Sequence, residues 1–175
     1  MIDGRQGSQP PSAAGAAKEA KSQYRRHLPH LQADRKTLFV TFSTRRRWVL
    51  PEGVRSLVLD HCLHDHESKL FMHAAVIMPD HVHLLCTPLA DPDGTTYGMA
   101  EIMSGIKGAS AHAVNRALGR RGAVWESESF DRLLRADEDR RLVAEYICAN
   151  PVRAQLCARE DDYPWLWREW IEGAQ

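Results

Sequence analysis

Two histidines separated by one residue are the first side chains of this chain whose spacing could do chemistry. His81 and His83 follow the break Met-Pro-Asp at residues 78–80 and lead into an apolar run at 84–86. Proline suits a turn or a strand edge, and successive side chains of a strand alternate between its faces, so both imidazoles are predicted to share one face at the start of a strand. Such a pair makes half of a metal site. The alternative is a pair of surface or hydrogen-bonding histidines.

A second pair of polar residues lies four positions apart in a segment of helical character. Tyr146 and Asn150 would project from one face of such a helix, about one turn apart. If they meet the histidines, the Tyr146 hydroxyl becomes a nucleophile and the Asn150 amide oxygen a third ligand. A phenol is a weak nucleophile at its ordinary pKa of about 10 and needs help. Separately, Tyr146 reads as an interfacial tyrosine and Asn150 as a helix cap before Pro151.

The donor types indicate which cation such a site would hold. Two neutral imidazoles and one amide oxygen are moderately hard ligands, which suits Mg²⁺ or Mn²⁺ held partly by a substrate phosphate. A divalent cation that grips a scissile phosphate polarises it and stabilises the leaving oxygen. Asp80, beside the histidines, is predicted as a turn residue, with the alternative that it holds a ligand imidazole.

Apolar patterns predict the elements that must bring these residues together. Strands are expected at 37–42, 69–77, 82–87 and, with a bulge or bend around 126–129, at 124–134. Helices are expected at 51–67, 97–118 and 137–149, the last capped by Asp137 and closed by Asn150 before Pro151. This order predicts an α+β, ferredoxin-like fold: a four-stranded antiparallel sheet with helices on one face, plus a C-terminal helix that carries Tyr146.

One other stretch is rich in metal-ligating residue types. Residues 61–66 read His-Cys-Leu-His-Asp-His and fall in the predicted helix 51–67. There His64 and His66 would diverge by about 200° and could not share an ion. His61 and His64 could bind zinc weakly, with no further ligand in view, so the stretch is interpreted as a solvated helix face.

The two ends of the chain are expected to differ from its body. Residues 1–22 are almost devoid of large apolar side chains, which predicts a disordered leader. Residues 23–158 form the predicted domain, and the aromatic tail 159–175 is expected to pack on it. No run of 18 apolar residues, no secretory leader and no Cys-x-x-Cys pair is found, so we expect a cytoplasmic protein with reduced, mostly buried thiols.

Charge is unevenly distributed although its sum is zero. Residues 1–50 hold 10 Lys and Arg against 3 Asp and Glu, whereas residues 51–175 hold 13 against 20. Such an asymmetry permits a basic surface that meets phosphate, and the alternative is a solvated basic tail. The run Arg-Arg-Arg-Trp at 45–48 could grip phosphates and stack a base, or be a charged strand exit.

Three motifs, in the same order along the chain, resemble those of a known protein family. Residues 78–85 read Met-Pro-Asp-His-Val-His-Leu-Leu, and residues 145–154 read Glu-Tyr-Ile-Cys-Ala-Asn-Pro-Val-Arg-Ala. The first resembles the HUH motif of single-tyrosine transposases, and the second resembles the Tyr-Ile-x-x-Asn-Pro-Val-x-Ala-Gly signature of the REP-associated tyrosine transposases, a domesticated branch. Val-Trp-Glu at 124–126, Phe-Asp-Arg at 130–132 and Tyr-Pro-Trp at 163–165 are also similar to that branch. The resemblance runs from about 25 to 167, with Gln155 where a glycine is usual.

The resemblance implies metal-dependent cleavage and strand transfer of single-stranded DNA. It makes His81, His83 and Asn150 the metal ligands and Tyr146 the nucleophile, which leaves a 5′-phosphotyrosine and a free 3′-hydroxyl. Rejoining by a 3′-hydroxyl conserves the bond energy, so no ATP is required. It also implies recognition of hairpins of repetitive extragenic palindromes beside a short single-stranded guide sequence, by a monomer or a homodimer.

With DNA as the implied partner, the basic residues become candidate phosphate contacts and one tryptophan a stacking platform. These candidates are Arg25, Arg26, Arg45, Arg46, Arg47, Lys107, Arg116, Arg120 and Arg121, with Trp48 as the platform. Taken singly, each of these basic residues is more often a solvated surface charge than a critical DNA contact. Two other functions stay open: a catalytically inactive hairpin-binding protein of the same fold, and a small zinc- or nickel-binding protein that uses the histidine pair.

Overall fold

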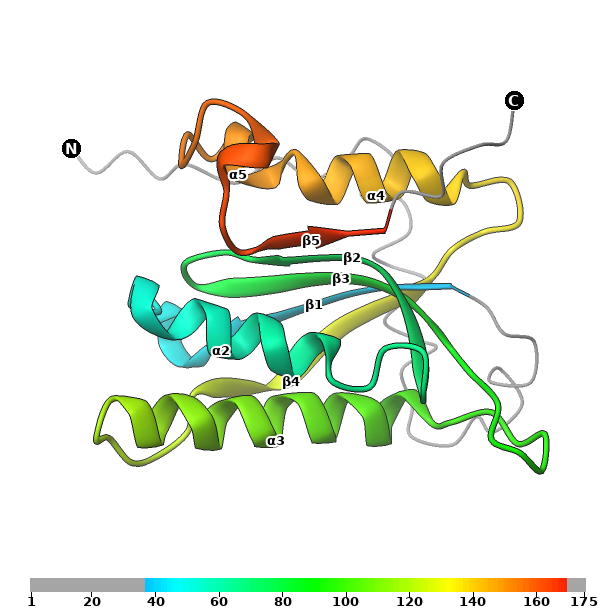
Figure 1. Cartoon of the computed structure of the whole chain (residues 1–175), viewed down its shortest axis with the longest axis horizontal. Helices are drawn as coiled ribbons and strands as arrows, with labels where there is room; N and C mark the ends of the chain where they lie inside the picture. Colours follow the sequence, from blue (N-terminus) through cyan, green and yellow to red (C-terminus); the bar gives the residue numbers. More distant parts are fainter. Residues whose placement is uncertain (1–36, 170–175) are drawn as a thin grey trace. The chain divides into compact units, whose positions relative to one another are not determined.

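The computed structural model describes residues 37–169, so the expected leader, Arg25 and Arg26 lie outside the described residues. Five strands form one antiparallel sheet in the order β4-β1-β3-β2-β5. They are β1 (Leu38–Thr44), β2 (Leu70–Ile77), β3 (His81–Pro88), β4 (Trp125–Leu133) and β5 (Leu166–Arg168). The helices are α2 (Glu52–Leu63), α3 (Met99–Ala117), α4 (Arg140–Cys148) and the short α5 (Asn150–Arg153), with 3₁₀ turns at Arg45–Arg47 and Glu160–Asp162 (Figure 1). The predicted ferredoxin-like order of the first four strands is confirmed, and β5 extends it.

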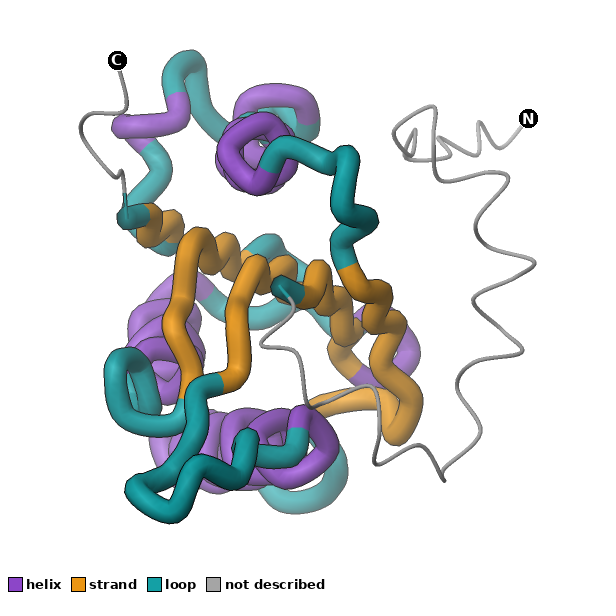
Figure 2. The backbone as a smooth tube through the Cα atoms, turned by 90° about the vertical axis from the view of Figure 1, so that its right-hand side faces the viewer, coloured by secondary structure: helices purple, strands orange, loops and turns teal. Residues whose placement is uncertain are grey.

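The helices divide between the two faces of the sheet. Helices α2 and α3 pack together below it in Figure 1, and α4 lies above it, an arrangement that Figure 2 shows from the side. On the lower face, Val40 and Phe42 of β1 share a core with Val58 and Ile106 of these helices. Burying a large apolar side chain of this kind stabilises the fold by about 1.5–3 kcal/mol, so this cluster supplies much of the stability.

The upper face has a smaller core, which seats α4. Ala74, Val76 and Leu85 of β2 and β3 pack with Ile147 and Cys148 of the helix. Leu85 points to this face because it lies two residues beyond His83 on the same strand. Side chains alternate strictly along β3, so His81 and His83 also face the α4 side, as the spacing predicts.

The bulge predicted in the last strand of the four is present. Phe42 of β1 pairs with Ser129, but Thr44 pairs with Trp125, so one residue of β1 is matched by three of β4. The extra residues lie within 126–128, inside the range expected. Below the bulge, the Trp125 indole N–H donates to Ser110 Oγ at 3.0 Å and its ring meets that of Phe42 edge to face, which anchors the start of β4 on α3.

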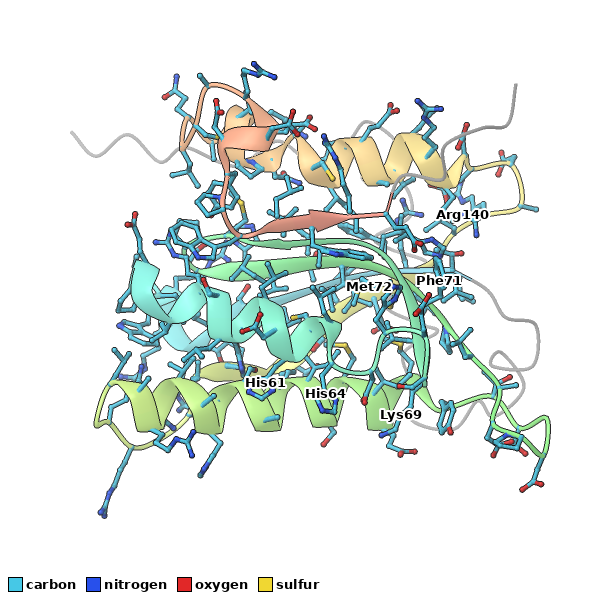
Figure 3. The ribbon with its side chains drawn as sticks, viewed as in Figure 1. His61, His64, Lys69, Phe71, Met72 and Arg140 are labelled. Carbon is cyan, nitrogen blue, oxygen red and sulfur yellow. The ribbon has the colours of Figure 1, made fainter. Side chains whose placement is uncertain are left out.

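The first helix is shorter than predicted. It ends at Leu63 rather than 67, because the Asp65 carbonyl accepts from three following backbone N–H groups and Glu67 takes a left-handed φ of 63°. The histidine-rich stretch is therefore not mid-helix: His64 caps the end of α2 (Figure 3), and His66 Nδ1 accepts from the Met72 backbone N–H at 3.0 Å. No group of three or more His, Cys, Asp or Glu side chains that could hold a metal occurs among residues 37–169.

The cap of the third helix lies two residues later than predicted, and the helix ends at Cys148, one residue before the expected 149. Asp139, not Asp137, caps α4, since its side chain accepts from the Arg141 N–H at 2.7 Å. At the other end the chain does not leave helical geometry before Pro151, because Ala149 stays in the right-handed helical region. Pro151 instead occupies the first turn of α5, where a missing N–H costs nothing.

The aromatic tail joins the sheet edge. The Tyr163 hydroxyl donates to the Ile77 carbonyl at 2.8 Å, and the Ile77 N–H donates to the Trp165 carbonyl at 2.9 Å. Strand β5 then pairs antiparallel with β2, with Trp167 opposite Ala75. The tail thereby covers what would be an exposed edge of β2.

The four cysteines are free thiols, and three of them, Cys62, Cys86 and Cys148, are buried. Burial is the main cause that raises the pKa of Cys86 to about 12 and that of Cys148 to about 11. These thiols are therefore protonated and act as small apolar core residues. Among the described helices, none has the length and apolar character that a membrane span requires.

Candidate active site

The two histidines of β3 converge on one point. His81 Nε2 and His83 Nε2 are 3.1 Å apart, with ring centroids at 4.7 Å and ring planes at 82°. Val82, between them, is fully buried on the opposite face of the sheet. The strand holds both rings because its own alternation places them side by side and its core residue pins the backbone beneath them.

The other nitrogen of each ring is held by an oxygen. His81 Nδ1 lies 2.6 Å from Asp80 Oδ1, so Nδ1–H donates to the carboxylate and Nε2 carries the lone pair. His83 Nδ1 lies 2.8 Å from Thr41 Oγ1 on the neighbouring strand, where a hydroxyl can either donate or accept. An imidazole held in this way at Nδ1 is the usual arrangement around a bound metal.

The spacing of the two free nitrogens fits a shared cation. Two ligands at about 2.1 Å and at right angles around a six-coordinate ion would be about 3.0 Å apart. The observed 3.1 Å also suits a hydrogen bond from His83 Nε2–H to His81 Nε2. The spacing of the pair is therefore compatible with either a shared proton or a shared metal ion.

Protonation of His83 does not compete strongly with metal binding. Burial is the largest cause that lowers its pKa to about 3, and its neighbours His81, Arg153 and Arg47 act in the same direction. The ring is thus neutral at physiological pH. A neutral imidazole is the form that binds metal.

A turn of three arginines borders the histidine pair. The arginine turn, Arg45–Arg47, is exposed, and Arg47 Nε lies 3.4 Å from Asp80 Oδ2. Arg46 and Arg47 have φ of 54° and 55°, the left-handed region that residues with a Cβ rarely adopt. Glu126 Oε1 accepts from the Arg46 backbone N–H at 2.7 Å and holds the turn in this shape.

Backbone hydrogen bonds fasten this turn to the histidine turn. The Thr44 N–H donates to the Asp80 carbonyl at 2.9 Å, and the Leu50 N–H donates to the Pro79 carbonyl at 2.7 Å. Thr44 Oγ1 adds a bond to the Trp48 carbonyl at 2.6 Å. The backbone itself therefore places the arginine turn next to the histidine turn, with Arg47 beside Asp80.

Tyr146 of α4 and Asn150 of α5 form the second half of the predicted site. Their helices lie on the side of the sheet that His81 and His83 face. The Arg153 guanidinium lies over the Tyr146 ring, 4.5 Å from its centroid. Arg153 is also one of the positive charges that lower the pKa of His83, so its field acts on the histidine pair as well. Tyr146 is half-buried, and Ile147 and Cys148 next to it anchor the helix to the sheet.

The Asn150 amide is oriented by its own helix. Its Nδ2 donates to the Tyr146 carbonyl at 3.2 Å and to the Ile147 carbonyl at 3.0 Å. These bonds use the N–H groups and leave Oδ1, the atom that a cation would bind, as the outward end of the amide. Asn150 therefore caps the last turn of α4 with its side chain, as the alternative reading expected, while its backbone continues the chain into α5.

The remaining candidates lie apart from the histidines. The Arg120 guanidinium stacks on Trp48 at 3.9 Å, so one face of that indole is already covered. Lys107 Nζ donates to the Ser127 carbonyl and to Ser129 Oγ, both at 3.1 Å. Arg116 and Arg121 are exposed at the end of α3, below the opposite face of the sheet.

Two residues at the site escaped the sequence interpretation. Thr41, the partner of His83 Nδ1, pairs directly with His83 across β1 and β3. Arg153 lies seven positions after Tyr146, two helical turns along the same face. The helical spacing of Arg153 was readable, whereas the register that selects Thr41 was not.

Sequence comparisons find no relative: no protein-family model matches the chain, and neither does any curated protein. Comparison with solved structures finds a REP-associated tyrosine transposase bound to a REP hairpin, with a TM-score of 0.59 and 23% identity over 82% of this chain and 80% of the other. A Deinococcus radiodurans protein provisionally assigned as a transposase follows, at 22% identity over 70% and 92% of the two chains and a TM-score of 0.47. A bacterial tRNA(His) guanylyltransferase-like protein in complex with GTP is 11% identical over 82% and 77%, with a TM-score of 0.44. The first of these shows that the chain shares its fold with a REP-associated tyrosine transposase.

Proposed function

We propose that this protein is a metal-dependent tyrosine nuclease that cuts and rejoins single-stranded DNA beside a palindromic hairpin. The observation that supports this most directly is the 3.1 Å convergence of His81 Nε2 and His83 Nε2 on the sheet face covered by the helix of Tyr146. The fold likeness adds weight, since the solved structure in question holds a REP hairpin.

In this proposal His81 Nε2, His83 Nε2 and Asn150 Oδ1 are the atoms that would hold Mg²⁺ or Mn²⁺. Their donor types fit such an ion, and Asp80 and Thr41 already hold the two imidazoles by Nδ1. When bound, the ion polarises the scissile phosphate and stabilises charge on it.

The protein's own residues carry the bond changes. The Tyr146 phenol gives up its proton to solvent and its oxygen attacks phosphorus. The bond from phosphorus to the 3′ oxygen breaks, and the leaving 3′ oxygen takes up a proton. The product is a 5′-phosphotyrosine and a free 3′-hydroxyl. Attack of a 3′-hydroxyl on that linkage restores a phosphodiester and frees Tyr146, so bonds are exchanged without net loss and no nucleotide cofactor is needed.

Arg153 and the arginine turn position the DNA backbone in this scheme. Arg153, stacked on Tyr146, supplies positive charge beside the nucleophile. Arg47 is held beside the histidines by Asp80, and Arg45 and Arg46 extend the basic surface outward. Phosphate contacts of this kind set register and carry no sequence information.

The outer candidates would contribute further phosphate and base contacts. The stacked pair of Trp48 and Arg120 offers the Arg120 cation to a strand, and Trp48 would have to exchange the stacked guanidinium for a base to act as a platform. Arg116 and Arg121 are exposed and can meet phosphate directly. Lys107 would have to exchange its bonds to Ser127 and Ser129 for a phosphate oxygen.

The decisive experiment incubates the full-length protein with hairpin DNA that carries a single-stranded flank, in Mg²⁺ or Mn²⁺. We expect a covalent protein–DNA adduct that survives denaturing electrophoresis. Tyr146→Phe should abolish the adduct and keep DNA binding, because only the nucleophilic oxygen is removed. Tyr97→Phe, two residues before α3, is the matched control and should form the adduct normally.

The alternative function is hairpin binding without cleavage. The arginine turn and the Trp48–Arg120 pair favour it, since neither needs Tyr146 to bind DNA. Hairpin binding by the wild type without any adduct in either metal would select this alternative. Metal binding with no affinity for DNA would select the third possibility, a small metal-binding protein.

A further inference from the structure

Helix α4 covers only part of the upper face of the sheet. It packs mainly on β2 and β3, whereas the strands on the other side, β1 and β4, turn Phe39, Thr41 and Phe130 to that face. Phe39 is half-buried at the boundary of the α4 core. Phe130 lies farther out, on the edge strand β4, and is 43% exposed.

A row of rings leads from the histidines to this exposed side chain. The ring of Phe39 stacks on that of His83 at 5.7 Å and 20°, and Phe130 meets Phe39 edge to face at 6.4 Å and 68°. We call His83, Phe39 and Phe130 the aromatic row. Its inner end is a proposed metal ligand, and its outer end has its ring in solvent.

The row is held rigidly. The Arg132 guanidinium lies 5.8 Å from the centre of the Phe39 ring and is fixed by a 2.7 Å bond to Glu138. Register places Phe130 opposite Thr41, and Thr41 opposite His83. Two strand spacings separate Phe130 from His83 along this line, about 10 Å, so the exposed ring lies close to the proposed cleavage centre.

A single exposed phenylalanine is ordinary on a protein surface. The position of Phe130 is what sets it apart, since it is the outer member of the aromatic row that starts at the proposed cleavage centre. Positive charges from Arg47 and Arg153 stand at that centre, where a phosphate would lie. An exposed ring this near a phosphate site has the right chemistry for an unpaired base, because every base has a π face.

We propose that Phe130 is the stacking platform for the base of the nucleotide adjacent to the scissile phosphate, an inference that rests on the DNA-cutting function proposed above. Phe130 is then a positioning residue. It aligns the strand across β1 so that the phosphate reaches Tyr146, and it does not touch the reacting atoms. The ligand is a single-stranded nucleotide with its base unpaired.

The test uses single-stranded DNA that the wild type cuts, in a series with one abasic site moved along the strand. Binding is measured by fluorescence anisotropy in the Tyr146→Phe background. Phe130→Ala should weaken binding by about 5- to 100-fold. One abasic position next to the cut should cause a loss of the same size, and the two losses should not add, because both remove the same stack.

Matched variants separate this result from a folding defect. Phe130→Trp should retain wild-type affinity, since a larger ring keeps the stack. Leu118→Ala removes an apolar side chain of similar exposure, 38%, on the opposite side of the sheet and should leave binding unchanged. In the wild-type background, Phe130→Ala should raise KM with little change in kcat at saturating DNA.

The possible failures are distinct. If the wild type cuts the DNA and Phe130→Ala binds it equally well, the platform is disproved and the proposed function stands. If Phe130→Ala weakens binding equally at every abasic position, the ring does not stack on a base and the platform is again disproved. If the wild type neither binds nor cuts single-stranded DNA, the proposed function itself fails.

Discussion

Asp80 Oδ1 lies 2.6 Å from His81 Nδ1, and the other carboxylate oxygen of Asp80 lies 3.4 Å from Arg47 Nε. One side chain thus fixes the tautomer of a proposed metal ligand and holds the first cation of the arginine turn. The two contacts use different oxygens, so neither competes with the other. Asp80 therefore couples the proposed metal pair to the proposed phosphate-binding surface.

Asp80→Asn should weaken Mn²⁺ binding by about 10- to 100-fold, the usual cost of losing a carboxylate that holds a ligand imidazole. Isothermal titration calorimetry of the full-length protein with MnCl₂ would measure this. Asp93→Asn, in the exposed loop before α3, is the control and should bind as the wild type does. An unchanged affinity in Asp80→Asn would show that His81 does not act as a metal ligand through this arrangement.

Arg153→Gln should slow formation of the tyrosine adduct by about 2- to 30-fold, because it removes the cation stacked on the Tyr146 ring. Single-turnover kinetics at saturating DNA measure the step directly. Arg159→Gln replaces an exposed arginine paired with Asp161 and should leave the rate unchanged. Equal rates in the wild type, Arg153→Gln and Arg159→Gln would show that Arg153 takes no part in adduct formation.

The arginine turn should make DNA binding dependent on salt. Neutralising Arg45 and Arg46 together by glutamine should reduce the slope of log K against log salt by about 0.7 for each single-strand phosphate that the protein then leaves unneutralised. Anisotropy titrations between low and physiological salt would give the slope. A slope that stays at the wild-type value would exclude the turn from phosphate binding, whatever the effect on affinity.

Acidification should destabilise the fold through His73. Burial, the largest cause, lowers its pKa to about 4, helped by Arg140, which lies at the start of α4 (Figure 3), and by His66. An unfolded histidine has a pKa of about 6.5, so between these values the unfolded chain binds more protons than the folded one. The free energy of unfolding should therefore fall as pH drops from about 6.5 towards 4.

Thermal melts across this pH range would test the effect of His73. His73→Gln should flatten the dependence of Tm on pH, since Gln can keep a bond to Thr87 Oγ1 without titrating. His112→Gln, at an exposed position of α3, should leave the dependence as in the wild type. A dependence that is identical in His73→Gln would assign the acid sensitivity to other groups.

Much of the fold follows from local patterns. Alternation along residues 81–86 predicts that His81 and His83 share a face, because backbone geometry alone decides which side chains of a strand point the same way. The order of strands and helices predicts the ferredoxin-like sheet, and the bulge near 126–129 is visible as a break in alternation. Local signals were less reliable at helix ends, where several candidate caps compete, as with Asp137 and Asp139.

The neighbours of the proposed catalytic residues were decided by the tertiary structure. Thr41 meets His83 across 42 positions of the chain because β1 pairs with β3 in one particular register. Arg47 meets Asp80 because backbone hydrogen bonds join two turns that no periodicity relates. Spacing along the chain determines which side chains share a face, whereas the packing of strands and helices determines which faces meet, since that choice depends on burial and hydrogen bonding summed over the whole domain.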